Sequence, residues 1–205
     1  EILEKRRSKE PESLAIALGN LGVLYSNAGR LPEAEALHRR ALEINEKHFG
    51  PSHQSIAANL NNLATVLQDL GRDNEVEQLY RRAMEVTLQT KGGQHPDMIT
   101  RYNNLAEFYR EHDWFEQAEP LYQKAIALAE SVFGPDHTDL AMCKGNLAKL
   151  YEDQNRHAES EVLYRQSLAI REKVFGNDHP AISVALHNLA SSLYKQGRYH
   201  DSEPL

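Results

Sequence analysis

The chain has 205 residues, of which 40% are apolar and 26% are charged, and its net charge is −7. This balance is typical of a folded chain rather than a disordered one. Nucleic-acid binders usually carry a basic surface and a high pI, whereas the pI here is about 5.8, so we expect no nucleic acid among the partners. No apolar run approaches the roughly 20 residues that cross a bilayer, so we expect no membrane partner.

The sequence shows neither a recognisable signal peptide nor a cysteine framework. Residues 1–7 are mostly charged and have no apolar stretch, so they do not resemble a signal peptide. Cys143 is the single cysteine, which rules out a disulfide within the chain. A reducing, cytoplasmic setting is the prediction that follows.

A 42-residue repeat runs through the whole sequence. An Asn-Leu pair followed by a small residue recurs at this spacing, with no insertion to shift the register. A glutamate recurs in the same register from Glu35 to Glu203, and a histidine from His53 to His179. Such regularity predicts stacked copies of one structural unit, because a single unit cannot bury its apolar face alone. The repeated asparagines, called the asparagine ladder below, are Asn20, Asn62, Asn104, Asn146 and Asn188.

Each unit is predicted to be a pair of antiparallel helices. In the first unit, Leu14, Leu18, Leu21 and Tyr25 follow helical spacing, and a glycine turn separates them from a second helix that ends at Phe49-Gly50. The fold class that follows is all-α, a right-handed superhelical solenoid of antiparallel helix pairs. The predicted divisions are residues 1–10, the end of a preceding repeat; 11–52, repeat one; 53–94, repeat two; 95–136, repeat three; 137–178, repeat four; and 179–205, a partial repeat five.

The two ends of the chain fit this scheme. Ile2 aligns with Ile44, so the chain is expected to begin inside a second helix, and it is expected to end inside another at Leu205. We therefore interpret the sequence as a piece of a longer array. A monomer is the prediction, with end-to-end association through Ile2-Leu3 and Pro204-Leu205 as the alternative.

Several positions carry a family resemblance. The small residue after Asn-Leu is followed three positions later by a tyrosine in three units, and alanines recur in the second helix, as at Ala34, Ala41, Ala83, Ala118 and Ala125. In these features the chain resembles the tetratricopeptide repeat family, and its longer unit, with phrases such as AEPLYQKA, is similar to the repeats of kinesin light chains. The resemblance implies a cytoplasmic protein–protein interaction scaffold of the cargo or adaptor type, which is not an enzyme. The alternative is a structural or regulatory sensor arm of a larger signalling protein, without a peptide ligand of its own.

The asparagine ladder lies on one face of the first helix of each repeat, opposite the predicted core. We call this face the polar face. A carboxamide both donates and accepts hydrogen bonds, so it can bind the backbone of an extended peptide whatever the peptide's sequence. The resemblance implies that this face lines a concave, peptide-binding groove; the alternative is that the ladder bridges adjacent helices or is solvated. The candidate peptide-binding residues are Asn20, Asn61, Asn62, Asn103, Asn104, Asn146, Lys149 and Asn188.

The charges near this face are mixed in sign. Glu107 and Lys149 lie one repeat apart, and acidic residues follow at the far end of the face. The sequence therefore does not show the basic groove associated with kinesin light chains, and acidic-cargo specificity is not predicted from the resemblance. Arg101 and Arg110 flank the face, and we interpret them as part of a solvated helix surface rather than as a carboxylate site.

Metal and catalytic sites are not predicted. Four of the ten histidines recur once per repeat, about 10 Å apart if the helices pack normally, whereas zinc ligands lie about 2 Å from one ion. Their positions at helix starts favour a capping role. No nucleophile or phosphate-loop motif accompanies them. We therefore expect no cofactor.

Overall fold

The computed structural model describes residues 2–176 and 179–203, with side chains described from residue 10 onward. Over these residues the chain consists of helices and short connections, without a strand. The helices are α1 (Ile2–Asn27), α2 (Leu31–Phe49), α3 (Gln54–Asp69), α4 (Asp73–Lys91), α5 (Asp97–Glu111), α6 (Phe115–Phe133), α7 (Thr138–Asp153), α8 (His157–Phe175), α9 (Pro180–Lys195) and α10 (Tyr199–Ser202). The predicted all-α fold is confirmed.

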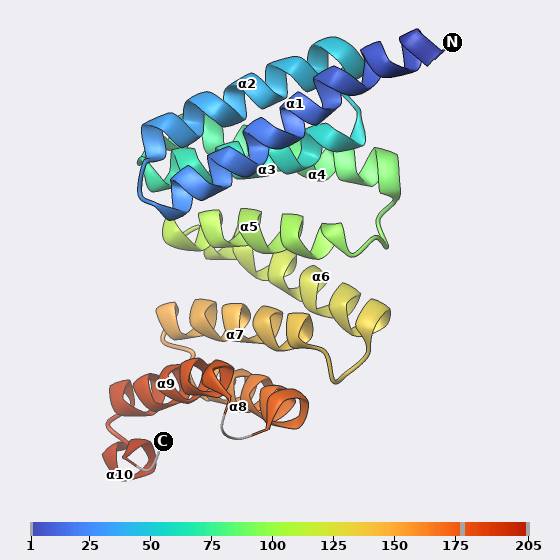
Figure 1. The fold of residues 1–205 in the computed structure, drawn as a ribbon. Helices are drawn as coiled ribbons and strands as arrows, with labels where there is room; N and C mark the ends of the chain where they lie inside the picture. Colours follow the sequence, from blue (N-terminus) through green and yellow to red (C-terminus); the bar gives the residue numbers. More distant parts are fainter. Residues whose placement is uncertain (1, 177–178, 204–205) are drawn as a thin grey trace. The chain divides into compact units, whose positions relative to one another are not determined.

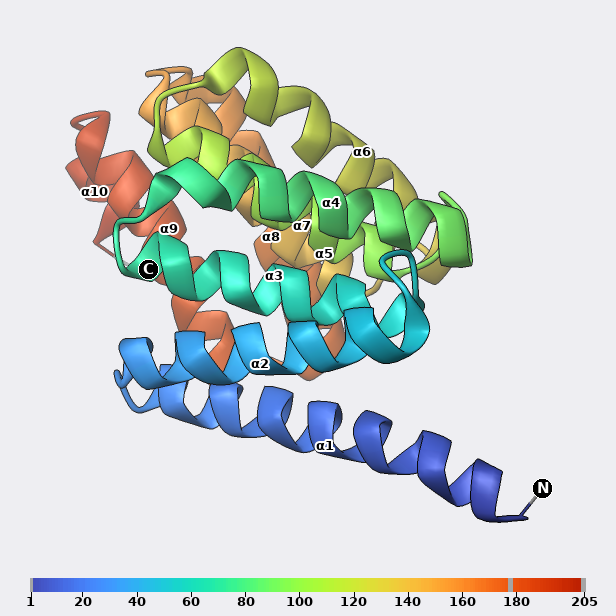
Figure 2. The same ribbon diagram turned by 90° about the horizontal axis from the view of Figure 1, so that it is seen from above.

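The chain divides into two compact units, residues 1–104 and residues 105–205. In unit one, α1 packs on α2, α2 on α3, and α3 on α4, and neighbouring helices run in opposite directions (Figures 1 and 2). In unit two the same succession joins α6, α7, α8, α9 and α10. Within each unit, helices adjacent in the sequence are adjacent in space, as a solenoid of helix pairs requires.

The connections between repeats use one local device. Gly50 ends α2 with a φ of +84°, which glycine adopts at little steric cost. His53 then starts α3, where its Nδ1 accepts a hydrogen bond from the Ser55 amide at 3.3 Å and its ring stacks on Phe49 with 4.7 Å between centroids. The capping role predicted for the repeated histidines is confirmed at His53, His95, His137 and His179.

The start of the chain differs from what the repeat predicts. α1 continues without a break from Ile2 to Asn27, through Pro11, where a connection between helices was expected. Ser8 occupies the repeat position of Gly50 there, so the residue that adopts a positive φ to end α2 has no counterpart. The assignment of residues 1–10 to a preceding repeat stays a prediction.

The predicted core face is correct in repeat two, whereas in repeat one only Leu18 of that face packs against a buried cluster. Leu60 and Leu63 of α3 are fully buried, Leu60 in a cluster that includes side chains from α2 and α4. The rest of this face of α1 is open, and Leu14 and Leu21 are 51% and 38% exposed. The reason is that α2 covers this face of α3, whereas no described helix covers it on α1. α1 instead buries its side around Ala15, which packs against α2.

The repeated glutamate joins successive repeats within each unit. Arg72, just before α4, reaches back to Glu35 of α2 at 2.7 Å. The same ion pair recurs in unit two between Arg156 and Glu119 at 2.8 Å. Exposed pairs of this kind contribute modestly, about 0–1 kcal/mol each, so they align neighbouring repeats while the buried apolar contacts supply most of the stability.

Candidate functional site

The asparagine ladder lies on the polar face, but its members differ in exposure. Asn20 is exposed on α1, whereas Asn62, Asn104, Asn146 and Asn188 are half-buried. Asn104 Nδ2 donates a hydrogen bond to Asn61 Oδ1 at 2.9 Å. This contact joins α5 to α3, so at least one rung of the ladder bridges helices, which is one of the alternatives raised by the sequence.

Two of the candidate residues are buried in the helix framework. Asn61 and Asn103 are 7% and 4% exposed. Asn103 Nδ2 donates to the carbonyl oxygen of Ile99 at 2.9 Å, one turn earlier on α5. The structure therefore does not bring Asn61 and Asn103 to the open surface.

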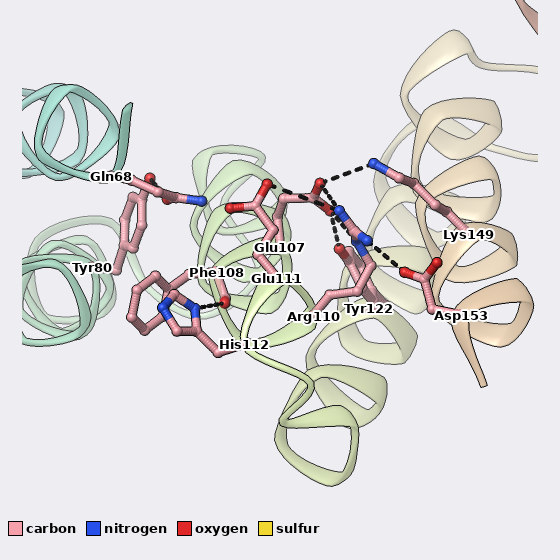
Figure 3. Close-up of polar contacts among 10 residues, drawn as sticks. All are labelled: Gln68, Tyr80, Glu107, Phe108, Arg110, Glu111, His112, Tyr122, Lys149 and Asp153. Carbon is pink, nitrogen blue, oxygen red and sulfur yellow. Dashed lines mark hydrogen bonds and ion pairs between the residues drawn. The ribbon is translucent and has the colours of Figure 1, made fainter. Parts of the chain in front are cut away.

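The interpretation of Arg101 and Arg110 as a solvated surface is wrong. Both are buried, at 8% and 9% exposure. Arg101 Nε donates to Thr87 Oγ1 at 3.4 Å in unit one. In unit two, Arg110 pairs with Glu107 at 2.6 Å and with Asp153 at 2.5 Å (Figure 3). These arginines point inward because the positions they occupy face the neighbouring helix.

The Arg110 network fixes the charge of its carboxylates. Burial opposes ionisation of Glu107, but hydrogen bonds from Arg110 and from the Tyr122 hydroxyl, at 2.6 Å, outweigh it and lower the pKa of Glu107 to about 2. Lys149 of α7 adds a further contact to Glu107 at 3.4 Å (Figure 3). The network ties α5, α6 and α7 together and uses charges that would otherwise be available to a ligand.

A pocket of about 340 Å³, called the Arg171 pocket, opens on the polar face of unit two. Three of the predicted residues, Asn146, Lys149 and Asn188, line it together. Residues of the same face on α7 and α9 complete its rim, and α8 supplies part of its floor. The predicted face thus contains a real cavity where repeats four and five meet. The lining also includes Gly145, Glu152, Asp153, Ser167, Arg171, Ala185 and Lys195.

The repeat register explains why the pocket lies here. Gly145 occupies the position that Asn61 and Asn103 fill in repeats two and three, so a buried side chain is missing. A Cβ at Gly145 would meet nothing closer than Ser167 Oγ at 3.7 Å. Ala185 of repeat five occupies the position of Arg101 in repeat three and of Cys143 in repeat four, and its side chain is smaller than either. Two large side chains are therefore replaced by small ones on facing helices.

Arg171 is the unusual side chain of this pocket. Its repeat position holds Asn45, Thr87 and Ala129 in the three preceding units. Its Nε is buried without a hydrogen-bond partner, and among the described residues no carboxylate forms an ion pair with it. Burial lowers the pKa of the guanidinium. Sequence reasoning missed Arg171, although comparing the same position across repeats would have singled it out.

The acidic residues of the pocket already have cationic partners. Glu152 pairs with Lys195 at 2.7 Å and accepts a hydrogen bond from the Tyr164 hydroxyl at 3.1 Å. Asp153 belongs to the Arg110 network. The guanidinium of Arg171 is thus the positive charge of the pocket without a paired anion, within the part of the chain that the structure describes.

Fold and face together define a repeat protein built from helical hairpins. The sequence also matches the model of the tetratricopeptide repeat family over residues 13–89, 55–127, 97–173 and 146–205. The chain belongs to the tetratricopeptide repeat family, and this membership indicates a protein–protein interaction scaffold.

Solved structures support the same fold. BtubC (BKLC) from P. vanneervenii is 23% identical with a TM-score of 0.79, over 98% of this chain and 84% of that one. A candidate kinesin light chain of nearly identical TPR-like repeats from Podosopora anserina is 23% identical with a TM-score of 0.80, over 95% and 92%. PilF of Pseudomonas aeruginosa is 21% identical with a TM-score of 0.68, over 95% and 74%. At these identities the likeness concerns the fold, and no curated protein matches the sequence.

Metal-binding clusters and membrane-spanning helices are absent from the described residues. These residues contain no group of three or more histidine, cysteine or acidic side chains arranged to hold a metal ion. No helix among them is both long enough and apolar enough to span a bilayer.

Proposed function

We propose that the chain binds an extended segment of a partner protein on its polar face, and that the Arg171 pocket receives an acidic side chain of that segment. The observation that carries this proposal is the half-buried Arg171 guanidinium, whose buried Nε has no hydrogen-bond partner and which has no paired carboxylate among the described residues. Leaving a buried charge unpaired is costly, so a carboxylate that enters the pocket gains a strong, charge-assisted hydrogen bond.

The surrounding groups suit a peptide ligand. Asn146 and Asn188 place carboxamides beside the pocket, where they can bind backbone groups on either side of the acidic residue. Glu152 and Asp153 add negative charge to the lining, which favours a singly charged carboxylate over a doubly charged phosphate. The positive charge is local to repeat four, in agreement with the mixed charges of the rest of the face.

Selection from a random peptide library, followed by affinity measurements, tests this proposal. Wild-type protein should enrich peptides with an aspartate or glutamate. Replacing Arg171 by alanine, the residue at this position in repeat three, should lower the affinity for these peptides about tenfold or more, because hydrogen bonds to charged groups contribute about 1.5–3 kcal/mol. Gly145→Asn should lower the affinity as well, since it places in the pocket the side chain that repeats two and three carry at this position.

Arg165→Ala is the matched control, because Arg165 lies on the same helix, outside the pocket, in a surface pair with Glu161. It should bind like wild type. Equal affinity of wild type, Arg171→Ala and Gly145→Asn for every selected peptide would refute the pocket. Failure to select any peptide would favour a sensor arm without a ligand of its own.

A further inference from the structure

Repeat one contains a second cavity on the polar face, built around a different substitution. Three consecutive repeats place a tyrosine at one position of their second helix: Tyr80, Tyr122 and Tyr164. Repeat one has His38 at this position. The imidazole is shorter than a phenol, so the space that the hydroxyl group occupies elsewhere is not filled by the chain.

In the later repeats the hydroxyl group is held by polar partners on the first helix. Tyr80 Oη lies 3.0 Å from Thr65 Oγ1 and donates to Gln68 Oε1 at 3.1 Å. Tyr122 and Tyr164 donate to the carboxylates of Glu107 and Glu152. A hydrogen-bonded hydroxyl at this place is therefore a regular feature of the repeat.

Repeat one lacks both halves of this arrangement. Val23 occupies the position of Thr65, and Ser26 occupies that of Gln68. His38 is only 1% exposed, and neither of its ring nitrogens has a hydrogen-bond partner. Burial lowers the pKa of the ring, so the neutral imidazole is favoured, with one nitrogen that donates and one that accepts.

A cavity of about 150 Å³, the His38 pocket, is lined by His38 and by Val23 and Ser26, whose counterparts Thr65 and Gln68 contact the tyrosine hydroxyl in repeat two. Its lining carries no charged side chain, and it includes Asn62 of the ladder. A charged group would lose its hydration there without gaining a counter-ion, so a neutral polar group fits better. The lining residues are Val23, Ser26, Asn27, His38, Asn62, Thr65 and Val66.

From this geometry we infer that the His38 pocket binds the hydroxyl group of a partner side chain, serine, threonine or tyrosine, in the place that the chain's own tyrosine hydroxyl takes in repeats two to four. A hydroxyl both donates and accepts, so it can satisfy a neutral imidazole that has no partner in the protein. The inference rests on the proposed function only in taking the ligand to be an extended peptide.

Two short peptides that differ in a single group test the inference: Ac-Ala-Ala-Thr-Ala-Ala-NH2 and its counterpart with valine. Each is titrated into the 205-residue protein while the side-chain amide signals of Asn62, which lines the pocket, are followed by NMR. The threonine peptide should shift these signals saturably and bind about tenfold more tightly than the valine peptide, since one methyl group replaces the hydroxyl. His38→Tyr should remove the difference, because the phenol fills the pocket. Arg40→Ala, on the same helix as His38 but outside the pocket and in a surface pair with Glu43, should keep it.

Equal affinities for the two peptides on wild type would overturn the inference, and so would the absence of any shift up to the solubility limit of the threonine peptide. Persistence of the threonine preference in His38→Tyr would overturn it as well. An acidic peptide titrated into wild type and Arg171→Ala reports separately on the Arg171 pocket, so failure of one site is distinguished from failure of the other.

Discussion

The close packing of Gly22 on His38, between the two helices of repeat one, can be tested with a single methyl group. Gly22 of α1 lies against the His38 ring, and a Cβ built at Gly22 would fall 2.7 Å from the ring atoms Cε1 and Nε2. Normal contacts between such atoms are about 3.5–4.0 Å, so the ring or the helix must move by roughly 1 Å. Repeats two to four combine an alanine with a tyrosine at these two positions.

Gly22→Ala should therefore destabilise the protein. Overpacking of this kind costs about 1–3 kcal/mol, and alanine recovers at most about 1 kcal/mol through its higher helix propensity. With full recovery the net loss is up to about 2 kcal/mol, and relative to an unstrained Gly→Ala change in the same helix the loss is about 1–3 kcal/mol. Adding His38→Tyr should restore much of it, because that pair of residues already occurs in three repeats of the same chain.

Urea denaturation followed by circular dichroism measures these differences. Gly19→Ala is the control in the same helix, since its Cβ would lie 3.5 Å from Asn59 Oδ1, an ordinary contact. That variant should be as stable as wild type or slightly more stable. If Gly22→Ala matches Gly19→Ala in stability, or if its effect is unchanged by His38→Tyr, the packing argument is refuted.

Three further predictions concern titration and capping. The pKa of Glu107 is about 2 in the folded protein, against 4.5 ordinarily, so its contribution to stability is complete above pH 4.5 and is lost as the pH falls toward 2. Glu107→Gln should therefore make the free energy of unfolding depend less on pH over that range. An unchanged pH dependence would contradict this. Because burial lowers the pKa of His38 below 6.5, the unfolded state takes up a proton first, so stability should fall as the pH drops below 6.5, and thermal unfolding of His38→Tyr should lack this component. His137→Ala removes both a helix cap and a ring stacked on Phe133, so chemical denaturation should show a loss of about 1 kcal/mol or more, whereas a loss below a few tenths would argue against the capping role.

Much of the fold follows from the sequence because the physical signals are local and repeated. Helical spacing, a glycine after each pair and a histidine at the next helix start were all visible at a 42-residue period. Five copies of one pattern leave little ambiguity about register. The same repetition placed the ladder and Lys149 on one face, and three of these residues do meet in the Arg171 pocket.

The predictions of burial from the sequence were wrong where the environment of a side chain depends on a neighbouring helix. Leu14 and Leu60 lie on the same apolar face of the first helix in their repeats. Leu60 is buried because α2 covers that face of α3, whereas Leu14 is exposed because no described helix covers it. Arg110 reads as a surface residue by type, but two carboxylates from α5 and α7 make its burial favourable.

The sequence by itself therefore determined the helix pairs, their register, the capping histidines and the face that carries the asparagines, because each depends on residues close together in the chain. The tertiary structure decided which of these side chains remain available. Asn61 is used by Asn104, and Arg110 by Glu107 and Asp153, while Arg171 and His38 are left without partners. Availability depends on which groups of different repeats come within hydrogen-bonding distance, and that is settled only when the helices pack.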